Sequence, residues 1–217
     1  MKPIVLYGHH AGPNPRKVAM VLEELGVPYI HKLMDFTELK KPAYEAINPN
    51  GRVPAIQDPN TEITLWESGA IIEYLVGTYD KERIISFTPG SSDYYHAKQW
   101  LYFQVSGQGP YFGQAVWFKV HHQERVISAL DRYMREIRRV LAVLNRSLDG
   151  REYLVNGTFS YVDISFVTWL EIIPWVSDGS ISLEIDYPAV FAWLNRVSGH
   201  DGVKKVLNME VKLPQRK

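Results

Sequence analysis

The chain has 217 residues, of which 46% are hydrophobic and 22% charged, enough for one large domain or two small ones with a buried core. Its formal net charge is zero, so no overall positive charge favours binding to nucleic acid or to an anionic membrane. The absence of cysteine excludes disulfides, a protein thiol nucleophile and thiolate metal ligands.

The N-terminal sequence MKPIVLYGHH lacks the long apolar core of a secretion signal. No apolar run approaches the length that a membrane-spanning helix needs. We therefore expect a cytoplasmic protein.

The first 33 residues predict a β-α-β unit. Residues 4–7 form a short apolar strand, and Asn14 with Pro15 suits the N-cap and first turn of a helix. An apolar stripe continues that helix to Gly26, and residues 29–33 read as a second strand. The two strands are expected to be parallel.

The sequence NPNGRVP at 48–54 follows a polar, partly helical connection over 35–47. A proline at a strand entrance is often cis, and it leaves Val53 with an unpaired main-chain edge that can bind an extended peptide. An ordinary turn before an edge strand is the competing interpretation, because proline is common at strand starts.

A two-stranded hairpin over residues 55–66 and a helix over 67–79 come next. At the start of that helix, the Ser68 hydroxyl and free N–H groups form a ready carboxylate site beside Glu67. Simple capping of the helix by Ser68 is equally compatible with the spacing. The order β-α-β-α-β-β-α predicts a thioredoxin-like sheet with helices on both sides.

The rest of the chain reads as helix. An aromatic-rich helix over 93–119 carries Gly107-Gln108-Gly109-Pro110, where we expect a kink or break. An amphipathic helix over 123–148 follows, and then a capping box at 160–163 before an apolar helix reaching 175. Short helices are expected near Pro188 and Gly202. The predicted domains are 1–82 and an all-helical 93–217, joined by a linker at 83–92.

Three motifs in this order, NPNGRVPAI, WESGAIIEYL and GTFSYVDIS, make the chain resemble a cytosolic glutathione S-transferase along essentially its whole length. The loop at 13–17 and GQGPYFGQ at 107–114 are most similar to the bacterial nu class and the fungal nitrogen-regulator-like class. The resemblance implies a homodimer with a thioredoxin-like N-terminal domain and a helical C-terminal domain. It also implies glutathione as co-substrate, with no metal, nucleic acid or membrane partner.

The resemblance also implies which residues hold glutathione. Val53, before a cis Pro54, would pair its main chain with the cysteinyl part. Glu67 and Ser68 would hold the γ-glutamyl end. Arg52 could assist with the charged ends of the peptide.

Two further glutathione contacts come from the same resemblance. Leu39 stands where many relatives have a His or Gln at the glycine end, and Lys40 beside it can substitute. Arg132 lies where members of the nu class have an arginine that reaches across the dimer towards the glutathione of the neighbouring subunit. Without this resemblance, the charge pattern of the helix indicates only a solvent-exposed charge at Arg132.

The chemical problem is to form a thiolate at neutral pH from a thiol whose pKa is about 8.5. Asn14 falls where similar proteins place an asparagine whose amide donates to sulfur, so it is the expected catalytic residue. Tyr7 is the alternative, because other subclasses use a tyrosine near the end of the first strand. A lone strand tyrosine is by default a core residue.

An apolar pocket for the electrophile is expected between the domains, lined by His10, Tyr111, Phe112 and Trp117. Trp169 and Trp175 are more readily explained as core. His9 and His10 are adjacent, but no third metal ligand lies near them and neither is assigned to catalysis.

Two functions fit these features. The first is a transferase acting on hydrophobic electrophiles, with glutathione-dependent disulfide or peroxide reduction as a further activity. The second is a non-catalytic binding or regulatory protein on the same scaffold.

Overall fold

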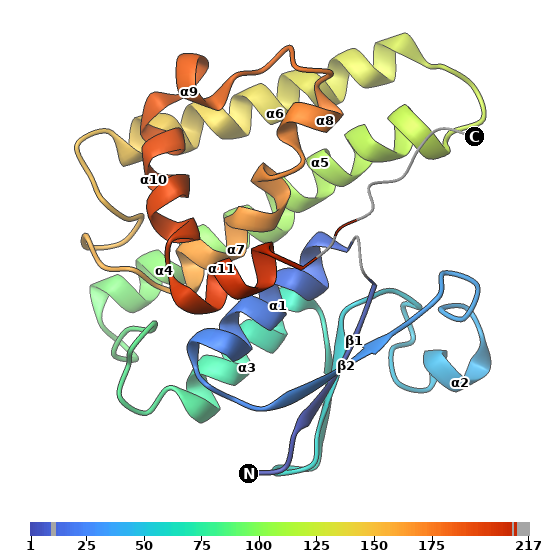
Figure 1. Ribbon diagram of the computed structural model, residues 1–217, viewed down its shortest axis with the longest axis vertical. Coiled ribbons are helices and arrows are strands. Elements are labelled where there is room, and N and C mark those ends of the chain that lie inside the picture. The colour runs from blue at the N-terminus through green and yellow to red at the C-terminus, as the bar shows by residue number, and fades with distance from the viewer. Residues whose placement is uncertain (10–11, 210, 212–217) are drawn as a thin grey trace. The chain divides into compact units, whose positions relative to one another are not determined.

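The computed structural model describes residues 1–9, 12–209 and 211, and Figure 1 shows its strands and helices. It divides into two compact units. The first unit comprises Met1–Ser86 and the segment that begins at Gly199; the second comprises Phe87–Ser198.

The first unit is built on a four-stranded sheet in the order β2-β1-β3-β4. Its strands are β1 (Ile4–Gly8), β2 (Tyr29–Leu33), β3 (Ala55–Asp58) and β4 (Ile63–Trp66). β1 pairs parallel with β2 and antiparallel with β3, and β3 pairs antiparallel with β4. This arrangement confirms the predicted thioredoxin-like sheet.

Helices cover both faces of this sheet. They are α1 (Pro13–Glu24), α2 (Pro42–Glu45) and α3 (Ser68–Tyr79). α1 and α3 pack against each other, and α2 lies on the other side of the strands (Figure 1). Successive residues of a strand point to opposite faces. Accordingly Tyr7 of β1 packs with Tyr44 of α2, while the fully buried Leu6 points to the opposite face.

The C-terminal helix α11 (Asp201–Leu207) belongs to the first unit, whereas the sequence assigned it to the helical domain of residues 93–217. It packs on α1 because their backbones approach closely at Gly202. The N–H of Val203 donates to the Glu24 carboxylate (3.1 Å), and the Arg16 guanidinium donates to the Val206 carbonyl (3.3 Å).

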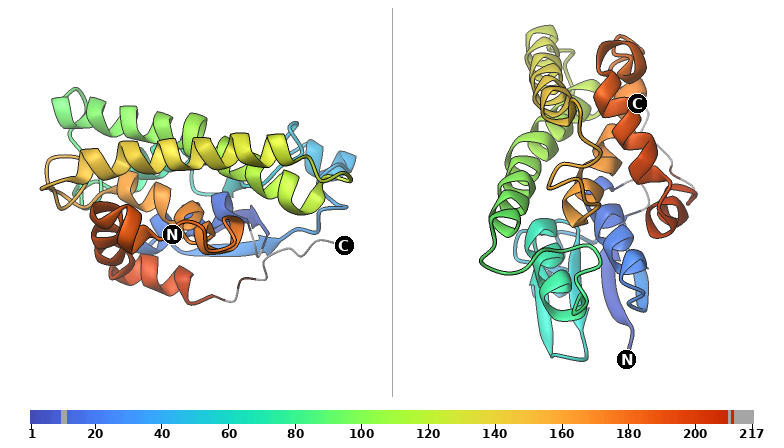
Figure 2. Two further views of the ribbon diagram at one scale, coloured as in Figure 1. Left: turned by 90° about the horizontal axis from the view of Figure 1, so that it is seen from above. Right: turned by 90° about the vertical axis from the view of Figure 1, so that its left-hand side faces the viewer.

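The second unit is entirely helical. It contains α4 (Ser92–Phe103), η1 (Gln104–Gln108), α5 (Gly109–Val116), η2 (Trp117–His121), α6 (Ile127–Leu148), α7 (Tyr161–Leu170), α8 (Ile173–Val176), α9 (Leu183–Asp186) and α10 (Pro188–Ser198). α5 and α6 run side by side (Figure 2). Every residue of α7 is buried, as expected for a helix that is apolar on all sides.

The kink or break expected near Pro110 takes the form of a π-helical turn between α4 and α5. The chain stays helical there and widens into the π-helical turn η1, in which the Gly109 N–H bonds to the Gln104 carbonyl five residues earlier. Pro110 follows as the second residue of α5 and needs no partner, since it has no N–H.

The capping box predicted at the start of α7 is confirmed by reciprocal bonds between Ser160 and Asp163. Within the part of the chain that the structure describes, no helix is long and apolar enough to cross a membrane.

Candidate functional site

Four segments of the first unit meet at one end of the sheet. Tyr7 pairs with Ala55, and Ala55 pairs with Trp66, so the end of β1, the start of β3 and the end of β4 are aligned. α1 follows β1 and α3 follows β4, which brings both helix N-termini to the same end. The Val53–Pro54 peptide lies there too, directly before β3.

The Val53–Pro54 peptide bond is cis, as predicted. Pro54 is buried, and the Val53 side chain packs against the Tyr7–Tyr44 cluster. Neither the N–H nor the C=O of Val53 bonds to any residue that the structure describes. An extended peptide can therefore pair with this main chain as it would with a strand edge.

The loop before Val53 is fixed by bonds to one carbonyl. The Arg52 carbonyl accepts from the Tyr44 hydroxyl (2.8 Å) and from the Asn48 amide (2.6 Å). Burial raises the pKa of Tyr44 to about 12, so its hydroxyl stays protonated and donates at neutral pH. Two side chains thus anchor the carbonyl of the residue before Val53.

Lys40 crosses the same loop at Gly51, whose φ is +58°. A Cβ at Gly51 would lie 2.8 Å from the Lys40 Nζ, so glycine is needed both for its conformation and for room. Lys40 donates to the Asn50 carbonyl (2.8 Å). Its ammonium therefore secures the turn, whatever else it contacts.

The N-terminus of α3 lies at the same end of the sheet. Ser68 is its first residue, and Glu67 is the N-cap. The backbone φ of Glu67 is +70°, which is uncommon for a residue other than glycine. No side chain caps this helix end. Ser68 therefore does not cap α3, and its hydroxyl has no partner among the described residues. Free N–H groups and a hydroxyl at a helix start suit a carboxylate.

The start of α1 differs from the prediction. Gly12 is the N-cap, and its N–H donates a hydrogen bond to the His9 carbonyl (2.9 Å). Asn14 lies in the first turn of the helix. Pro13 can begin the helix because its φ is preset and its missing N–H is not needed there. Pro15 also lacks an N–H, so Asn14 alone contributes one within the first three residues. Asn14 is half-buried at this end.

Tyr7, the alternative donor, is already engaged. Only 5% of it is exposed, and its hydroxyl donates to the Gln57 side-chain oxygen (2.7 Å). Its ring lies 5.7 Å from that of Tyr44, on the α2 face of the sheet. This placement supports the core interpretation of Tyr7.

The chain matches two family profiles: "Glutathione S-transferase, N-terminal domain" over residues 11–77 and "Glutathione S-transferase, C-terminal domain" over residues 110–201. It is 46% identical over 216 residues to the glutathione S-transferase-like protein gedE of Aspergillus terreus, covering 95% of each chain. This chain belongs to the glutathione S-transferase family.

Solved structures of family members agree. The glutathione transferase URE2P6 of Phanerochaete chrysosporium, solved with oxidized glutathione, has a TM-score of 0.91 and 48% identity, with 95% of each chain covered. Ure2p, solved with glutathione, has a TM-score of 0.87 and 33% identity, with 94% of this chain and 98% of that chain covered. The predicted likeness to the nitrogen-regulator-like class is confirmed.

Sequence reasoning missed one buried charged residue whose electrostatic neighbour is Glu67, namely Lys17. It is fully buried in α1, and burial lowers its pKa to about 7 against the opposing influence of the Glu67 carboxylate. Residues 13–17 were treated as a loop from the sequence. A signal was present, because Lys17 is three and four residues before Met20 and Val21 on the buried stripe of the helix.

Two further predicted site residues, Arg52 and Arg132, are arginines with exposed side chains. Neither side chain has an ion-pair partner among the described residues. The His9 ring packs against Phe36 in a tilted arrangement, with ring centroids 4.2 Å apart. His10 lies outside the described residues, and no group of three metal-ligating side chains occurs within the described ranges.

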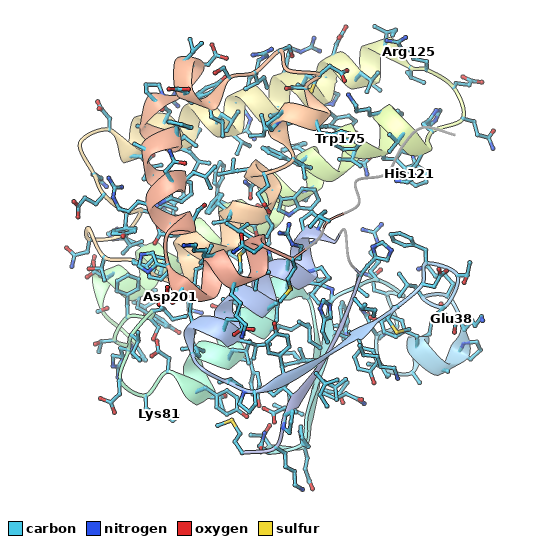
Figure 3. All side chains as sticks on the ribbon, viewed as in Figure 1. Glu38, Lys81, His121, Arg125, Trp175 and Asp201 are labelled. Atoms are coloured by element: carbon cyan, nitrogen blue, oxygen red, sulfur yellow. The ribbon has the colours of Figure 1, made fainter. Side chains whose placement is uncertain are left out.

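The aromatic residues of the second unit divide into two groups. Phe112 was expected on a pocket wall but is fully buried, with its ring 6.4 Å from that of Trp169, so it is a core residue. Trp117 is 49% exposed and lies 5.5 Å from the ring of His121, which Figure 3 labels. Tyr111 is half-buried under the Arg139 guanidinium, 5.7 Å from its ring.

Proposed function

We propose that this chain binds glutathione and activates its thiol for attack on hydrophobic electrophiles. The observation that carries the proposal is the unpaired main chain of Val53, at a cis bond, beside the uncapped start of α3. In this pose Val53 pairs with the cysteinyl residue of the tripeptide. The Ser68 hydroxyl and the N–H groups at the start of α3 bind the γ-glutamyl carboxylate of the tripeptide. The Glu67 carboxylate pairs with the γ-glutamyl amine.

Asn14 is the proposed catalytic residue. Its side-chain amide donates to the glutathione sulfur, and the start of α1 adds a favourable electrostatic field. Both stabilise the thiolate over the thiol and lower the thiol pKa towards neutrality. The thiolate then attacks the electrophile, and Asn14 itself transfers no proton.

The remaining contacts follow the family pattern. Lys40 and Arg52 serve the charged ends of glutathione, and Tyr111 and Trp117 contact the apolar electrophile. A homodimer would bring Arg132 towards the neighbouring glutathione. Disulfide or peroxide reduction is a further activity in which glutathione supplies every thiol, because the chain has no cysteine.

A binding protein without turnover is the second candidate, since relatives of the Ure2 type share this fold. Calorimetry with glutathione and turnover assays with chlorodinitrobenzene, a peroxide and hydroxyethyl disulfide separate the two. We expect saturable binding and turnover of at least one substrate. Binding without turnover would support the second candidate, and absence of binding would reject both.

A further inference from the structure

The first turn of α1 has a proline on each side of Asn14, the proposed donor to the glutathione sulfur. Pro13 and Pro15 have no N–H, so neither can donate a main-chain hydrogen bond to the helix. The turn around Asn14 is closed by the Arg16 N–H, which donates to the Gly12 carbonyl at 3.3 Å. This distance exceeds the usual value of about 2.9–3.0 Å for such bonds. Contacts from outside α1 therefore matter for the position of this turn.

The Arg16 side chain supplies such a contact, because it ties the turn to α11. Only 6% of Arg16 is exposed, and its guanidinium donates to the Val206 carbonyl (3.3 Å) in the last turn of α11. Carbonyls at the C-terminal end of a helix carry partial negative charge, which suits a cation. The Val206 carbonyl also accepts from the Met209 N–H (3.2 Å). A buried guanidinium without an acceptor would be costly, so this bond fixes residue 16 relative to α11.

α11 is itself held on the other end of α1. The Val203 N–H donates to the Glu24 carboxylate (3.1 Å), and the Lys205 ammonium pairs with the Glu23 carboxylate (2.7 Å). Gly202 allows the two backbones to approach, as described above. The contacts follow opposite orders along the two helices, so α11 lies antiparallel along α1 (Figure 1). All of them lie within the first unit.

We propose that Arg16 is a positioning residue for Asn14. It anchors the first turn of α1 to α11 and thereby fixes where the Asn14 amide meets the glutathione sulfur. The two residues are two positions apart on a helix of 3.6 residues per turn, so their side chains leave it on opposite sides. Arg16 therefore acts through the backbone of the turn. The inference rests on the proposed function, because it requires Asn14 as the donor to sulfur.

Two variants of the full chain disturb this anchor from its two sides. Arg16→Met removes the guanidinium, whereas Gly202→Ala pushes α11 away from α1 without changing any charge. In both, Asn14 should donate less well to the thiolate, so the kinetic pKa of the bound thiol should rise by about 0.5–1 unit. The glutathione Kd should stay within about twofold of the wild type, because the contacts at Val53 and Ser68 are untouched.

Lys205→Met is the matched control. It breaks an exposed ion pair of the same two helices, at the end of α1 far from Asn14. The thiol pKa of this variant should equal that of the wild type, even if its melting temperature falls. If Arg16→Met does not fold, Gly202→Ala compared with Lys205→Met decides the matter.

A double variant tests whether Arg16 acts through Asn14. In the Asn14→Ala background, Arg16→Met should raise the thiol pKa no further, because the donor that it positions is already absent. Additive shifts would overturn the proposal. They would mean that the guanidinium stabilises the thiolate through its own charge.

An unchanged thiol pKa in Gly202→Ala would also overturn the proposal, even where Arg16→Met raises it, since α11 would then have no part in the effect. So would an equal shift in Lys205→Met. Asn14→Ala, measured in parallel, separates this inference from the proposed function. If Asn14→Ala raises the thiol pKa while Arg16→Met and Gly202→Ala do not, only the role of Arg16 fails. If Asn14→Ala leaves it unchanged, the proposed donor fails and the role of Arg16 fails with it.

Discussion

At the scale of single residues, the choice between Asn14 and Tyr7 decides how the thiol is activated. The Tyr7 hydroxyl is committed to Gln57 within the sheet, whereas Asn14 lies at the start of α1, where the proposed glutathione sulfur would sit. A donor to sulfur favours the thiolate, so its loss raises the pKa of the bound thiol.

We therefore predict that Asn14→Ala raises the kinetic pKa of the bound thiol by about one to two units. Turnover at pH 6.5 should fall about tenfold or more, recover towards pH 9, and leave the glutathione Kd nearly unchanged. Tyr7→Phe is the matched control and should keep the pH profile of the wild type. A pH-independent loss in Asn14→Ala, or a severe loss in Tyr7→Phe alone, would contradict the assignment.

The buried Lys17 predicts a pH dependence of stability. Its pKa is lowered from 10.5 to about 7 in the folded chain, so between these values the unfolded chain binds the proton and the folded chain does not. The free energy of unfolding should therefore rise as pH increases from 7 to 9, by at most about 1.4 kcal/mol per pH unit.

Lys17→Met should abolish this rise, because methionine has no group that titrates. Urea unfolding of both chains at pH 7, 8 and 9 measures the difference. Lys204→Met, at an exposed position of α11, should retain the slope of the wild type. Equal slopes in wild type and Lys17→Met would show that Lys17 does not titrate in this range.

At the scale of elements, local signals predicted most of what was found. The hairpin of β3 and β4, the cis Pro54 and the capping box of α7 each depend on a few neighbouring residues. The wrong predictions concern features that depend on contacts between residues far apart in the sequence. The start of α1 lies before Asn14, and Phe112 points into the core.

The capping box shows how one carboxylate joins several elements. One oxygen of Asp163 accepts from the Leu154 N–H (3.0 Å) and the Trp193 indole (2.8 Å). The other accepts from the Ser160 N–H and hydroxyl, both at 3.0 Å. Asp163 itself is fully buried on α7. It therefore anchors α7 to α10 and to the preceding loop.

Asp163→Asn should destabilise the chain by about 3 kcal/mol. The substitution replaces one carboxylate oxygen with an NH₂ group, and this group would then lie against two hydrogen-bond donors instead of accepting from them. Asp149→Asn, at an exposed position after α6, is the matched control and should lie within about 0.5 kcal/mol of the wild type. Urea unfolding of the three chains provides the comparison. A loss in Asp163→Asn as small as in the control would mean that the network contributes little.

At the scale of the whole molecule, the chain returns from the second unit to the first at α11. α11 packs on α1 because Gly202 has no side chain: a Cβ there would lie 2.6 Å from the Glu24 nitrogen. The sequence predicted a helix near Gly202 but placed it in the helical domain, since nothing local reveals which unit a short amphipathic helix joins. The site at the sheet end was more predictable, because cis Pro54 and Ser68 flank one hairpin.

Gly202→Ala should force α11 away from α1 and destabilise the chain by about 1–3 kcal/mol. Gly77→Ala is the contrasting variant, since Gly77 is exposed in α3 with nothing within 4 Å of an added Cβ. It should stabilise the chain by roughly 0.5–1 kcal/mol through helix propensity. Thermal unfolding of both variants tests this, and equal effects would contradict the close approach.

The central claim is that the main chain of Val53 and the start of α3 together receive glutathione. Titration of the ¹⁵N-labelled chain with glutathione, followed by amide chemical shifts, tests it most directly. We predict that the Val53 and Ser68 amide signals shift saturably with one common Kd. In the Ser68→Ala variant glutathione binding should weaken, so the Val53 amide should shift less at the same glutathione concentration. Unchanged Val53 and Ser68 amides at millimolar glutathione would contradict the account.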